Sequence, residues 1–539
     1  MTPTSEDTTT TPSETHAPPA GRRPLATPAP RRVWLTGLAL GAVAAVTAFL
    51  LFPYGPDGDL AFEGDSELVA DLESAVDPDL VQGLVTARFP VDDPDGVEWA
   101  NAGTAGGSEP VGPDTPFETA SVFKAFTAMT LVDMVENGET SLERTLEEIF
   151  PEVDFTDPAV AGATLGEVAT HHAGLSPAPV GDDPSGILRG QVLGDLYRTS
   201  MPAREYLPRA EAMTQGTFMY SNVGYAVLGE ALAEESGTPY EELVRERVLD
   251  PLDMDDTMIS GDGVPEGGAG PHIGPGARVE EWRNTDYAAA GIGTWSTPAD
   301  LVRFTTAVAD GTAPGLAALE PVHPELTPGV PSDHDVDNAD AASVGLGLGW
   351  FRWEYPGAGE MTWASGGLTG VRTMVAVGEE EAVVIMANSF TVEAPALAGE
   401  LLSDDPERVG NGIAPLQGVL TSAGLIVPPL LLLALMARRR TLLTQRRLDR
   451  LRVVSLSLGN LAWTLFFLRM GAWTLVPHAL WAVAVGAVVT GVTVGVWYFR
   501  RVPVEAGRWR WLHVPVFVMS VTYSLLIGGA GLWGMLIAW

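Results

Sequence analysis

The stretch Glu118–Thr127 reads ETASVFKAFT, and it holds the only lysine of the 539-residue chain, Lys124. The chain has 31 Lys and Arg side chains in all, and every other one is an arginine. Arginine keeps its proton near neutral pH, whereas a lysine can lose its proton when burial or a neighbouring charge lowers its pKa. The single lysine therefore indicates a task that needs a free amine.

Ser121 precedes Lys124 by three residues, so a helix that starts near Ser121 would place both side chains on one face. The amine would then lie within hydrogen-bond distance of the hydroxyl, which describes an activated nucleophile. Most residues between Val122 and Val132 are apolar, which predicts a buried helix. The alternative is a solvated lysine on an amphipathic helix, because a serine three residues before a lysine is a weak signal by itself.

Two further segments carry groups suited to the same reaction. Tyr220-Ser221-Asn222 precedes a helical pattern; a tyrosine beside a lysine can relay the serine proton, and Asn222 can orient the lysine or hold a substrate carbonyl. Ala364–Gly370 reads ASGGLTG between two predicted strands, where glycines allow a substrate to approach the backbone. A strand-edge N–H there, with that of Ser121, can form an oxyanion hole. The structural alternatives are an ordinary helix N-cap and a tight hairpin turn.

Predicted strands stand near both ends of the soluble part of the chain, with helices between them. Strand patterns cover Leu80–Phe89, Val97–Ala102, Leu346–Trp353, Glu360–Trp363, Arg372–Val377 and Ala382–Asn388. The clearest helical patterns cover Ala163–Ala173 and Ser221–Ser236, and Ala396–Leu402 is expected as a closing helix. We therefore expect one sheet shared by both ends of the domain, into which a helical subdomain is inserted.

The segment from about Leu80 to Leu402 resembles the serine hydrolases related to class C β-lactamases and D-alanyl-D-alanine carboxypeptidases, also called penicillin-binding-protein-like. Ser121–Lys124 matches the S-x-x-K motif of penicillin-recognising enzymes. Tyr220–Asn222 matches the Tyr-x-Asn motif of the class C relatives, and Ser365-Gly366 matches part of the family's third motif.

The resemblance implies an α/β (α+β) fold, in which an antiparallel sheet is flanked by helices and carries an inserted all-helical subdomain. It also implies roles for individual residues. The implied catalytic residues are Ser121, Lys124, Tyr220 and Asn222. The implied oxyanion and substrate edge consists of Ser121, Ser365, Gly366 and Gly367.

One position departs from the family pattern. The third motif usually opens with Lys or His, whereas Ala364 stands first here, and the missing cation would have helped to hold a substrate carboxylate. The sequence predicts a serine hydrolase that forms an acyl-enzyme on Ser121 and acts on an ester, a D-amino-acid peptide or a β-lactam-like amide. The alternative is a catalytically vestigial, penicillin-binding-like module that binds or senses a ligand on a membrane bundle.

Apolar runs predict a membrane protein with five spans. Val33–Phe52 has no charge and follows Arg31 and Arg32, and further spans are expected near 415–437, 453–473, 476–499 and 512–535. Basic residues before the first run and in the loops after the second and fourth runs predict a cytoplasmic N-terminus. A long signal peptide is the alternative for the first run. The predicted domains are a disordered cytoplasmic tail (1–32), a transmembrane helix (33–53), a linker (54–65), an extracytoplasmic hydrolase domain (66–408) and a four-helix membrane domain (413–539).

The soluble part is strongly acidic. Residues 54–412 hold 64 Asp and Glu against 15 Lys and Arg, which disfavours nucleic acid and anionic lipid headgroups as partners. The chain has no Cys, and its eight His form no H-E-x-x-H motif, so we predict no cofactor and no metal. The expected partner is a small-molecule or peptide acyl substrate, for instance one derived from the cell wall.

Overall fold

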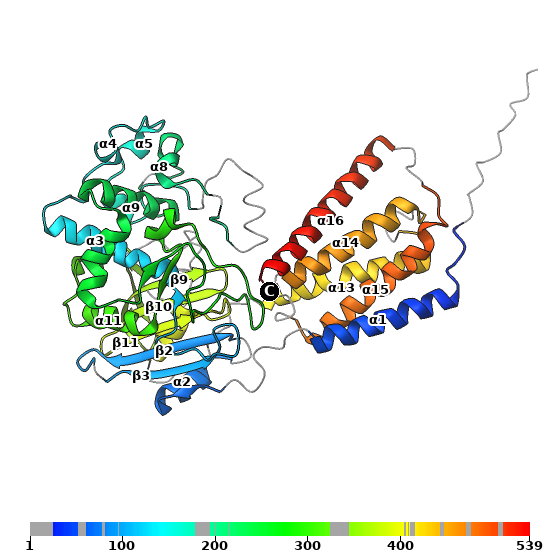
Figure 1. The fold of residues 1–539 in the computed structure, drawn as a ribbon, viewed down its shortest axis with the longest axis horizontal. Helices are drawn as coiled ribbons and strands as arrows, with labels where there is room; N and C mark the ends of the chain where they lie inside the picture. Colours follow the sequence, from blue (N-terminus) through cyan, green and yellow to red (C-terminus); the bar gives the residue numbers. More distant parts are fainter. Residues whose placement is uncertain are drawn as a thin grey trace, which may run out of the picture.

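The computed structural model describes residues 25–51, 61–77, 81–94, 96–177, 195–198, 200–214, 216–323, 344–403, 406–407, 409, 415–441, 447–469, 476–504 and 510–538. These residues form a domain built on a large sheet, which lies beside a bundle of long helices (Figure 1). Most of the predicted tail and most of the predicted linker lie outside the described residues.

The large sheet is antiparallel throughout and has the strand order β1-β3-β2-β11-β10-β9-β8-β7. Its strands are β1 (Glu63–Gly64), β2 (Gly83–Pro90), β3 (Glu98–Gly103), β7 (Val344–Leu346), β8 (Phe351–Tyr355), β9 (Gly359–Leu368), β10 (Val371–Val377) and β11 (Glu381–Ala387). Because β2 pairs with β11, the two ends of the domain share one sheet, as the sequence predicts. The predicted fold class is confirmed.

The bounds of two predicted strands are wrong. Leu346–Trp353 is not one strand but parts of two, β7 and β8, with a bend between them at which Gly349 has a positive φ of 74°. The strand predicted for Glu360–Trp363 continues as β9 to Leu368, so most of the Ala364–Gly370 motif lies within a strand. Its glycines are poor strand formers, but pairing with β10 holds them in the sheet.

Both faces of the sheet are covered, which explains the nearly continuous apolar runs of its central strands. Along β2, Val85, Ala87 and Phe89 contribute to the core shared with α3 (Phe123–Glu136), α9 (Asn222–Ser236) and α11 (Pro298–Ala309). Leu84 contributes to the core shared with α2 (Ser66–Ala75) and α12 (Ala394–Leu401). Side chains that alternate between two cores are buried whichever way they point.

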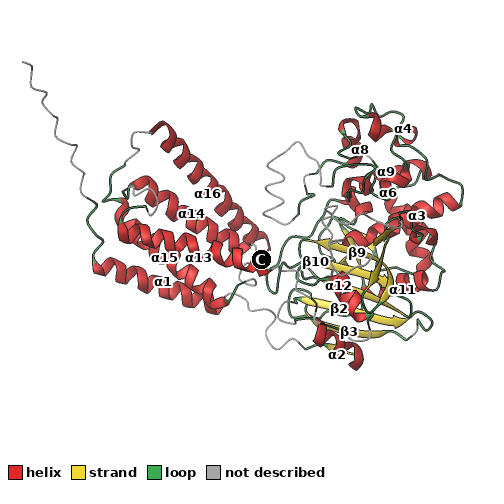
Figure 2. Cartoon of the chain, turned by 180° about the vertical axis from the view of Figure 1, so that it is seen from behind, coloured by secondary structure: helices red, strands yellow, loops and turns green. Residues whose placement is uncertain are grey.

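The predicted helical subdomain is inserted between β4 (Phe117–Glu118) and β7, and its helices gather on one side of the sheet (Figure 2). The helices of the domain are α2 (Ser66–Ala75), α3 (Phe123–Glu136), α4 (Leu146–Ile149), α5 (Pro158–Ala161), α6 (Leu165–Ala169), α8 (Ala203–Tyr206), α9 (Asn222–Ser236), α10 (Tyr240–Val244), α11 (Pro298–Ala309) and α12 (Ala394–Leu401). The 3₁₀ helices are η2 (Ala120–Val122), η3 (Leu207–Arg209), η5 (Asp250–Leu252), η6 (Thr285–Ala290) and η7 (Leu316–Leu319), and η4 (Arg245–Leu249) is a π-helix. A small second sheet joins β4 (Phe117–Glu118), β6 (Thr294–Ser296) and β5 (Met258–Ile259) in that order.

Helix α6 is shorter than the predicted Ala163–Ala173. A capping box between Thr164 and Glu167 fixes its start, and it ends at Ala169. His171 follows with a positive φ of 61°, which a helix does not allow.

The bundle contains α1 (Arg31–Leu51), α13 (Pro415–Arg438), α14 (Arg450–Arg469), α15 (His478–Phe499) and α16 (Arg510–Ala538). By length and composition, four segments of the described chain can cross a membrane: Arg31–Leu50, Val419–Arg438, Arg450–Arg469 and His478–Phe499. Within α16 the apolar stretch is His513–Gly529, which is shorter than each of these four segments. The fifth predicted span therefore stays a prediction.

Helix α1 packs directly along α15 through small residues. A Cβ on Gly41 would collide with the Thr490 hydroxyl and lie 2.5 Å from the Gly486 carbonyl oxygen. Thr490 also donates a hydrogen bond to the Gly37 carbonyl at 3.1 Å. Small residues that let two helix backbones approach are typical of helix pairs inside membranes.

Candidate active site

Ser121 lies in the tight turn η2, which joins β4 to α3. The residue before it, Ala120, is fully buried and has a positive φ of 49°, a conformation that costs a residue with a Cβ about 1–3 kcal/mol. Two glycines pack against this turn. A Cβ on Gly291 would collide with the Ala120 carbonyl, and a Cβ on Gly366 would lie 2.8 Å from the Ser121 nitrogen. Close contacts between backbones therefore fix the position of the serine.

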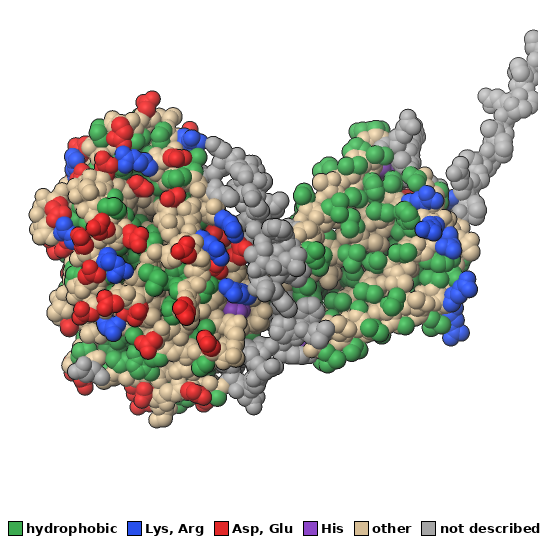
Figure 3. Space-filling model, viewed as in Figure 1, with side chains coloured by type: hydrophobic (Ala, Val, Ile, Leu, Met, Phe, Trp, Pro, Cys, Tyr) green, Lys and Arg blue, Asp and Glu red, His purple; other side chains and the backbone are tan. Residues whose placement is uncertain are grey.

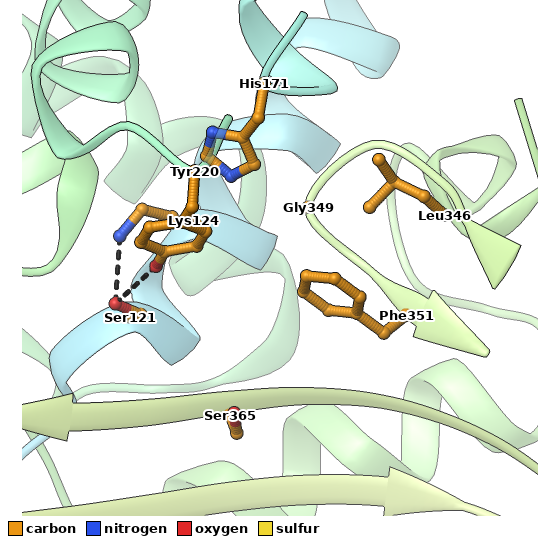
Figure 4. A pocket seen from close by; sticks show the side chains of 8 residues that line it. All are labelled: Ser121, Lys124, His171, Tyr220, Leu346, Gly349, Phe351 and Ser365. Carbon is orange, nitrogen blue, oxygen red and sulfur yellow. Dashed lines mark hydrogen bonds between the residues drawn. The ribbon is translucent and has the colours of Figure 1, made fainter. Parts of the chain in front are cut away.

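Ser121, Lys124 and Tyr220 point toward one another (Figure 4). Lys124 Nζ lies 2.9 Å from Ser121 Oγ, and the Tyr220 hydroxyl donates to the same oxygen at 2.8 Å. Lys124 stands in the first turn of α3, which gives the predicted i, i+3 relation to the serine. Tyr220 comes from the residues just before α9. The structure thus brings three of the predicted site residues together around one hydroxyl.

The Lys124 amine is almost completely buried, with 2% of the residue exposed, so the alternative of a solvated lysine is wrong. Burial lowers the pKa of Lys124 well below its ordinary value of 10.5. Its Nζ donates to the carbonyl oxygen of Ala290 at 2.6 Å. A neutral amine has two N–H groups and one lone pair, so it can donate to Ala290 and still accept a proton from Ser121.

His171 packs against Tyr220, with 4.4 Å between the two ring centres. The Ser221 backbone N–H donates to His171 Nδ1 at 3.1 Å, which places a ring proton of neutral His171 on Nε2. Ser221 also caps α9, because its hydroxyl oxygen accepts from the Gly224 N–H at 2.8 Å. The predicted N-cap and the predicted tyrosine therefore coexist in one motif, and the cap fixes the direction of Tyr220.

Asn222, the fourth predicted catalytic residue, makes its hydrogen bond outside the group around the Ser121 hydroxyl. It does not line the pocket around Ser121, and its side-chain amide donates to the Tyr197 hydroxyl at 2.7 Å. Tyr197 packs in turn against Trp282, with 4.9 Å between ring centres. Asn222, the first residue of α9, thus ties this helix to Tyr197. Its Oδ1 is buried and has no hydrogen-bond partner among the described residues.

The pocket wall opposite the serine carries no charged side chain among the lining residues. Ser121, Lys124, His171 and Tyr220 face Leu346, Gly349, Phe351 and Ser365 across the pocket (Figure 4). The ring of Phe351 stacks on Trp363 at 4.7 Å between ring centres. Sequence reasoning missed Leu346 and Phe351, because apolar strand residues resemble ordinary core. The glycine-rich run Gly345–Trp350 could have indicated that this segment packs closely against α3 and forms part of the pocket.

Three predicted edge residues lie along β9, and each has a different position. Ser365 lines the pocket, whereas Gly366 packs on the serine turn, so glycine at 366 accommodates the protein's own backbone rather than a substrate. Gly367 pairs with Arg372 of β10. β8 pairs with β9 only as far as Trp363. Beyond that residue, β9 pairs with β10 along one edge, and its opposite edge faces the serine turn.

Within the described part of the chain, no three His, Asp or Glu side chains come together in a way that would hold a metal ion. The polar side chains that line this pocket are the hydroxyls of Ser121 and Ser365, the buried Lys124 amine, the Tyr220 phenol and the His171 imidazole.

A family model and several known proteins match this chain. A family model described as Beta-lactamase matches residues 93–404. The chain is 29% identical over 202 residues to the D-alanyl-D-alanine-carboxypeptidase/endopeptidase AmpH of Escherichia coli (strain K12), a match that covers 35% of this chain and 48% of the relative. It is 25% identical over 258 residues to penicillin-binding protein 4 of Amycolatopsis lactamdurans, covering 45% of this chain and 64% of that protein. The chain thus spans about half to two thirds of the length of these relatives.

Solved structures with a similar chain path include an octameric penicillin-binding protein homologue from Pyrococcus abyssi. It has a TM-score of 0.49 and 20% identity, and covers 62% of this chain and 75% of its own. The family assignment rests on the sequence model rather than on this likeness. Because that model covers more than half of the 539 residues, the chain belongs to the Beta-lactamase family.

Proposed function

We propose that this protein is a serine acyl hydrolase that works through an acyl-enzyme on Ser121. The observation that carries the proposal is the arrangement of two proton-transfer groups, Lys124 and Tyr220, within 2.9 Å of one hydroxyl. A serine with a base in hydrogen-bond contact is the requirement for nucleophilic catalysis. The named relatives, a carboxypeptidase and a penicillin-binding protein, support an acyl substrate.

In the proposed reaction the neutral Lys124 amine accepts the hydroxyl proton as Ser121 Oγ attacks a carbonyl carbon. Tyr220 contacts the same oxygen, so it can pass a proton between the amine and the leaving group. The leaving alcohol or amine takes that proton, and the acyl group stays on Ser121. Water then attacks the ester by the reverse proton path and releases the acid, which restores the serine.

The developing oxyanion requires N–H donors beside the attacked carbonyl. We propose the backbone N–H groups of Ser121 and Gly367 for this role. The support is that β9 packs against the serine turn at Gly366, so the next N–H along the strand lies near that of Ser121.

We also propose that the substrate carries no carboxylate next to the scissile bond. The pocket wall of Leu346, Phe351 and Ser365 holds no cation in the described residues. Arg372, the sheet partner of Gly367, donates to the carbonyls of Leu368 and Val371 at 3.3 and 3.0 Å and lies over the Phe390 ring. The strongly acidic domain further repels anions.

We propose a multi-pass membrane protein with a cytoplasmic N-terminus and the hydrolase domain outside the cytoplasm. Basic side chains gather at the end of the bundle that is remote from the domain (Figure 3). Exposed arginines of this end include Arg31, Arg32, Arg438, Arg440, Arg500 and Arg501. Such clusters are retained on the cytoplasmic side of a membrane.

The acyl-enzyme is tested with a fluorophosphonate probe and a fluorescent penicillin. We expect at least one of them to label the full-length protein covalently, and Ser121→Ala to lose that label completely because the attacking oxygen is gone. Ser66→Ala, at the exposed start of α2, keeps the nucleophile and serves as the matched control. Equal labelling of wild type and Ser121→Ala, or none of either, would leave only the vestigial ligand-binding module.

Two variants test whether Lys124 is the base. Lys124→Arg should slow Ser121 labelling as strongly as Lys124→Ala, by roughly 10²–10⁴-fold, because arginine cannot accept the proton. Lys124→Met should also lose activity but raise the melting temperature at neutral pH. The pKa of Lys124 is lower in the folded state than in the unfolded state, so the wild-type chain must release a proton when it folds at neutral pH. The free energy that this deprotonation costs becomes smaller as the pH rises toward 10.5.

The gain in melting temperature of Lys124→Met should therefore shrink as the buffer pH rises. Labelling rates and melting curves from pH 6 to about pH 10 measure both effects. A folded Lys124→Arg protein that reacts at nearly the wild-type rate would refute the amine as the base and leave Tyr220 in that role.

The charge preference is tested with two activated esters of matched length, one with a neutral acyl chain and one ending in a carboxylate. We expect kcat/KM for the neutral ester to exceed that for the anionic ester by about tenfold or more, the scale of one missing charge contact. High salt should narrow this difference, because it screens the acidic surface. A preference for the carboxylate would overturn the proposed substrate class.

The topology is tested by cysteine labelling, because the native chain contains no Cys. A cysteine placed at Thr441, in the basic loop after α13, should react with an impermeant maleimide only after the cells are opened. A cysteine placed at exposed Ala70 of α2 should react in intact cells. The opposite pattern would invert the proposed orientation.

A further inference from the structure

One segment, residues 271–291, connects the helix bundle to the serine turn, and we name it the connecting segment. Its tip lies against the bundle. Ala277 is 5% exposed and belongs to one apolar cluster with Ala48 of α1, Leu425 of α13 and Trp481 of α15. Arg469, the last residue of α14, is also buried and donates to the carbonyl of Arg278 at 3.4 Å.

The tip is a rigid hairpin rather than a loose loop. Ile273 N donates to the Ala277 carbonyl at 3.0 Å, and Val279 N donates to the Pro271 carbonyl at 2.9 Å. At the base of the hairpin, His272 N lies 3.1 Å from the carbonyl oxygens of both Gly370 and Asn388. Gly370 belongs to the turn that follows β9, so the hairpin is bound to the strand whose edge faces the serine.

The far end of the connecting segment reaches the reacting groups. Trp282 N donates to Glu118, a buried residue of β4, at 3.1 Å. The Ala290 carbonyl accepts from Lys124 Nζ at 2.6 Å. Gly291 then packs on the Ala120 carbonyl, next to the nucleophile. Three contacts along one segment therefore surround the turn that carries Ser121.

We propose that the membrane bundle positions the active site through the connecting segment, with Ala277 and Arg469 as positioning residues for acylation. The inference rests on the proposed function. The bundle holds the hairpin tip, the hairpin base holds the β9–β10 turn, and the far end holds the Ala290 carbonyl toward the lysine. A hairpin released from the bundle allows Ala290 to move, and a shift of about 1 Å in such a contact can cost up to about 10²-fold in rate.

The test uses the full-length protein in lipid nanodiscs and the rate of Ser121 labelling by the fluorophosphonate probe as a function of pH. Ala277→Asp places a carboxylate in the apolar contact, and Arg469→Gln removes the charged donor while α14 keeps its length. Arg469→Lys retains a charged donor. Ala70→Asp, on the exposed face of α2, is the matched control for an added carboxylate.

We expect Ala277→Asp and Arg469→Gln to slow labelling about tenfold or more. We also expect the acidic limb of their pH profiles to move to higher pH, because water that enters beside Lys124 restores its ordinary pKa. Arg469→Lys and Ala70→Asp should stay within about twofold of wild type, since both leave the contact in place. Melting curves identify any variant that fails to fold, and the Arg469 pair then carries the test.

The two proposals fail in different ways. If wild type itself is not labelled at Ser121, the proposed hydrolase function fails. If wild type is labelled, and folded Ala277→Asp or Arg469→Gln reacts at the same rate with the same pH profile, the positioning role of the bundle is overturned while the hydrolase stands.

Discussion

The arrangement of the site depends on how closely three backbone segments approach one another at Ser121. Ala120 is held in a left-handed conformation, and Gly291 and Gly366 leave room for its carbonyl and for the serine nitrogen. A side chain at either glycine would move the serine away from β9 or move Ala290 away from Lys124. Because the packed interior does not relax freely, the strain at Ala120 persists and keeps the hydroxyl in one place.

The site also depends on a buried amine that has no counter-ion. The chain carries a net charge of −38, yet in its described part no carboxylate forms an ion pair with Lys124, and burial lowers the pKa of its amine. A nearby carboxylate would favour the charged form and keep the proton on the amine. The apolar helix α3 keeps Nζ buried and thus preserves a base in a very acidic protein.

The sequence predicted the sheet shared by both ends and the meeting of Ser121, Lys124 and Tyr220, because buried strands and a lone lysine leave local signals. It misplaced the end of β9, since the pairing that holds glycines in that strand comes from β10 and not from propensity. It did not identify Leu346 and Phe351 as residues of the pocket wall, because apolar residues give the same sequence pattern in a pocket wall as in a hydrophobic core. The partner of Asn222, Tyr197, belongs to a segment without regular secondary structure, and no spacing pattern links the two.

The sheet shared by both ends of the domain also has a consequence for how the chain is made. Gln82, just before β2, bonds to Ser389, just after β11, across 307 residues, and Ala29, just before α1, bonds to Tyr498 of α15 across 469 residues. Contacts so distant in sequence form late and slowly. During synthesis the β2–β3 pair therefore keeps an open edge and α1 lacks its neighbour until most of the chain exists, so a ribosome-bound intermediate of this protein needs protection against aggregation.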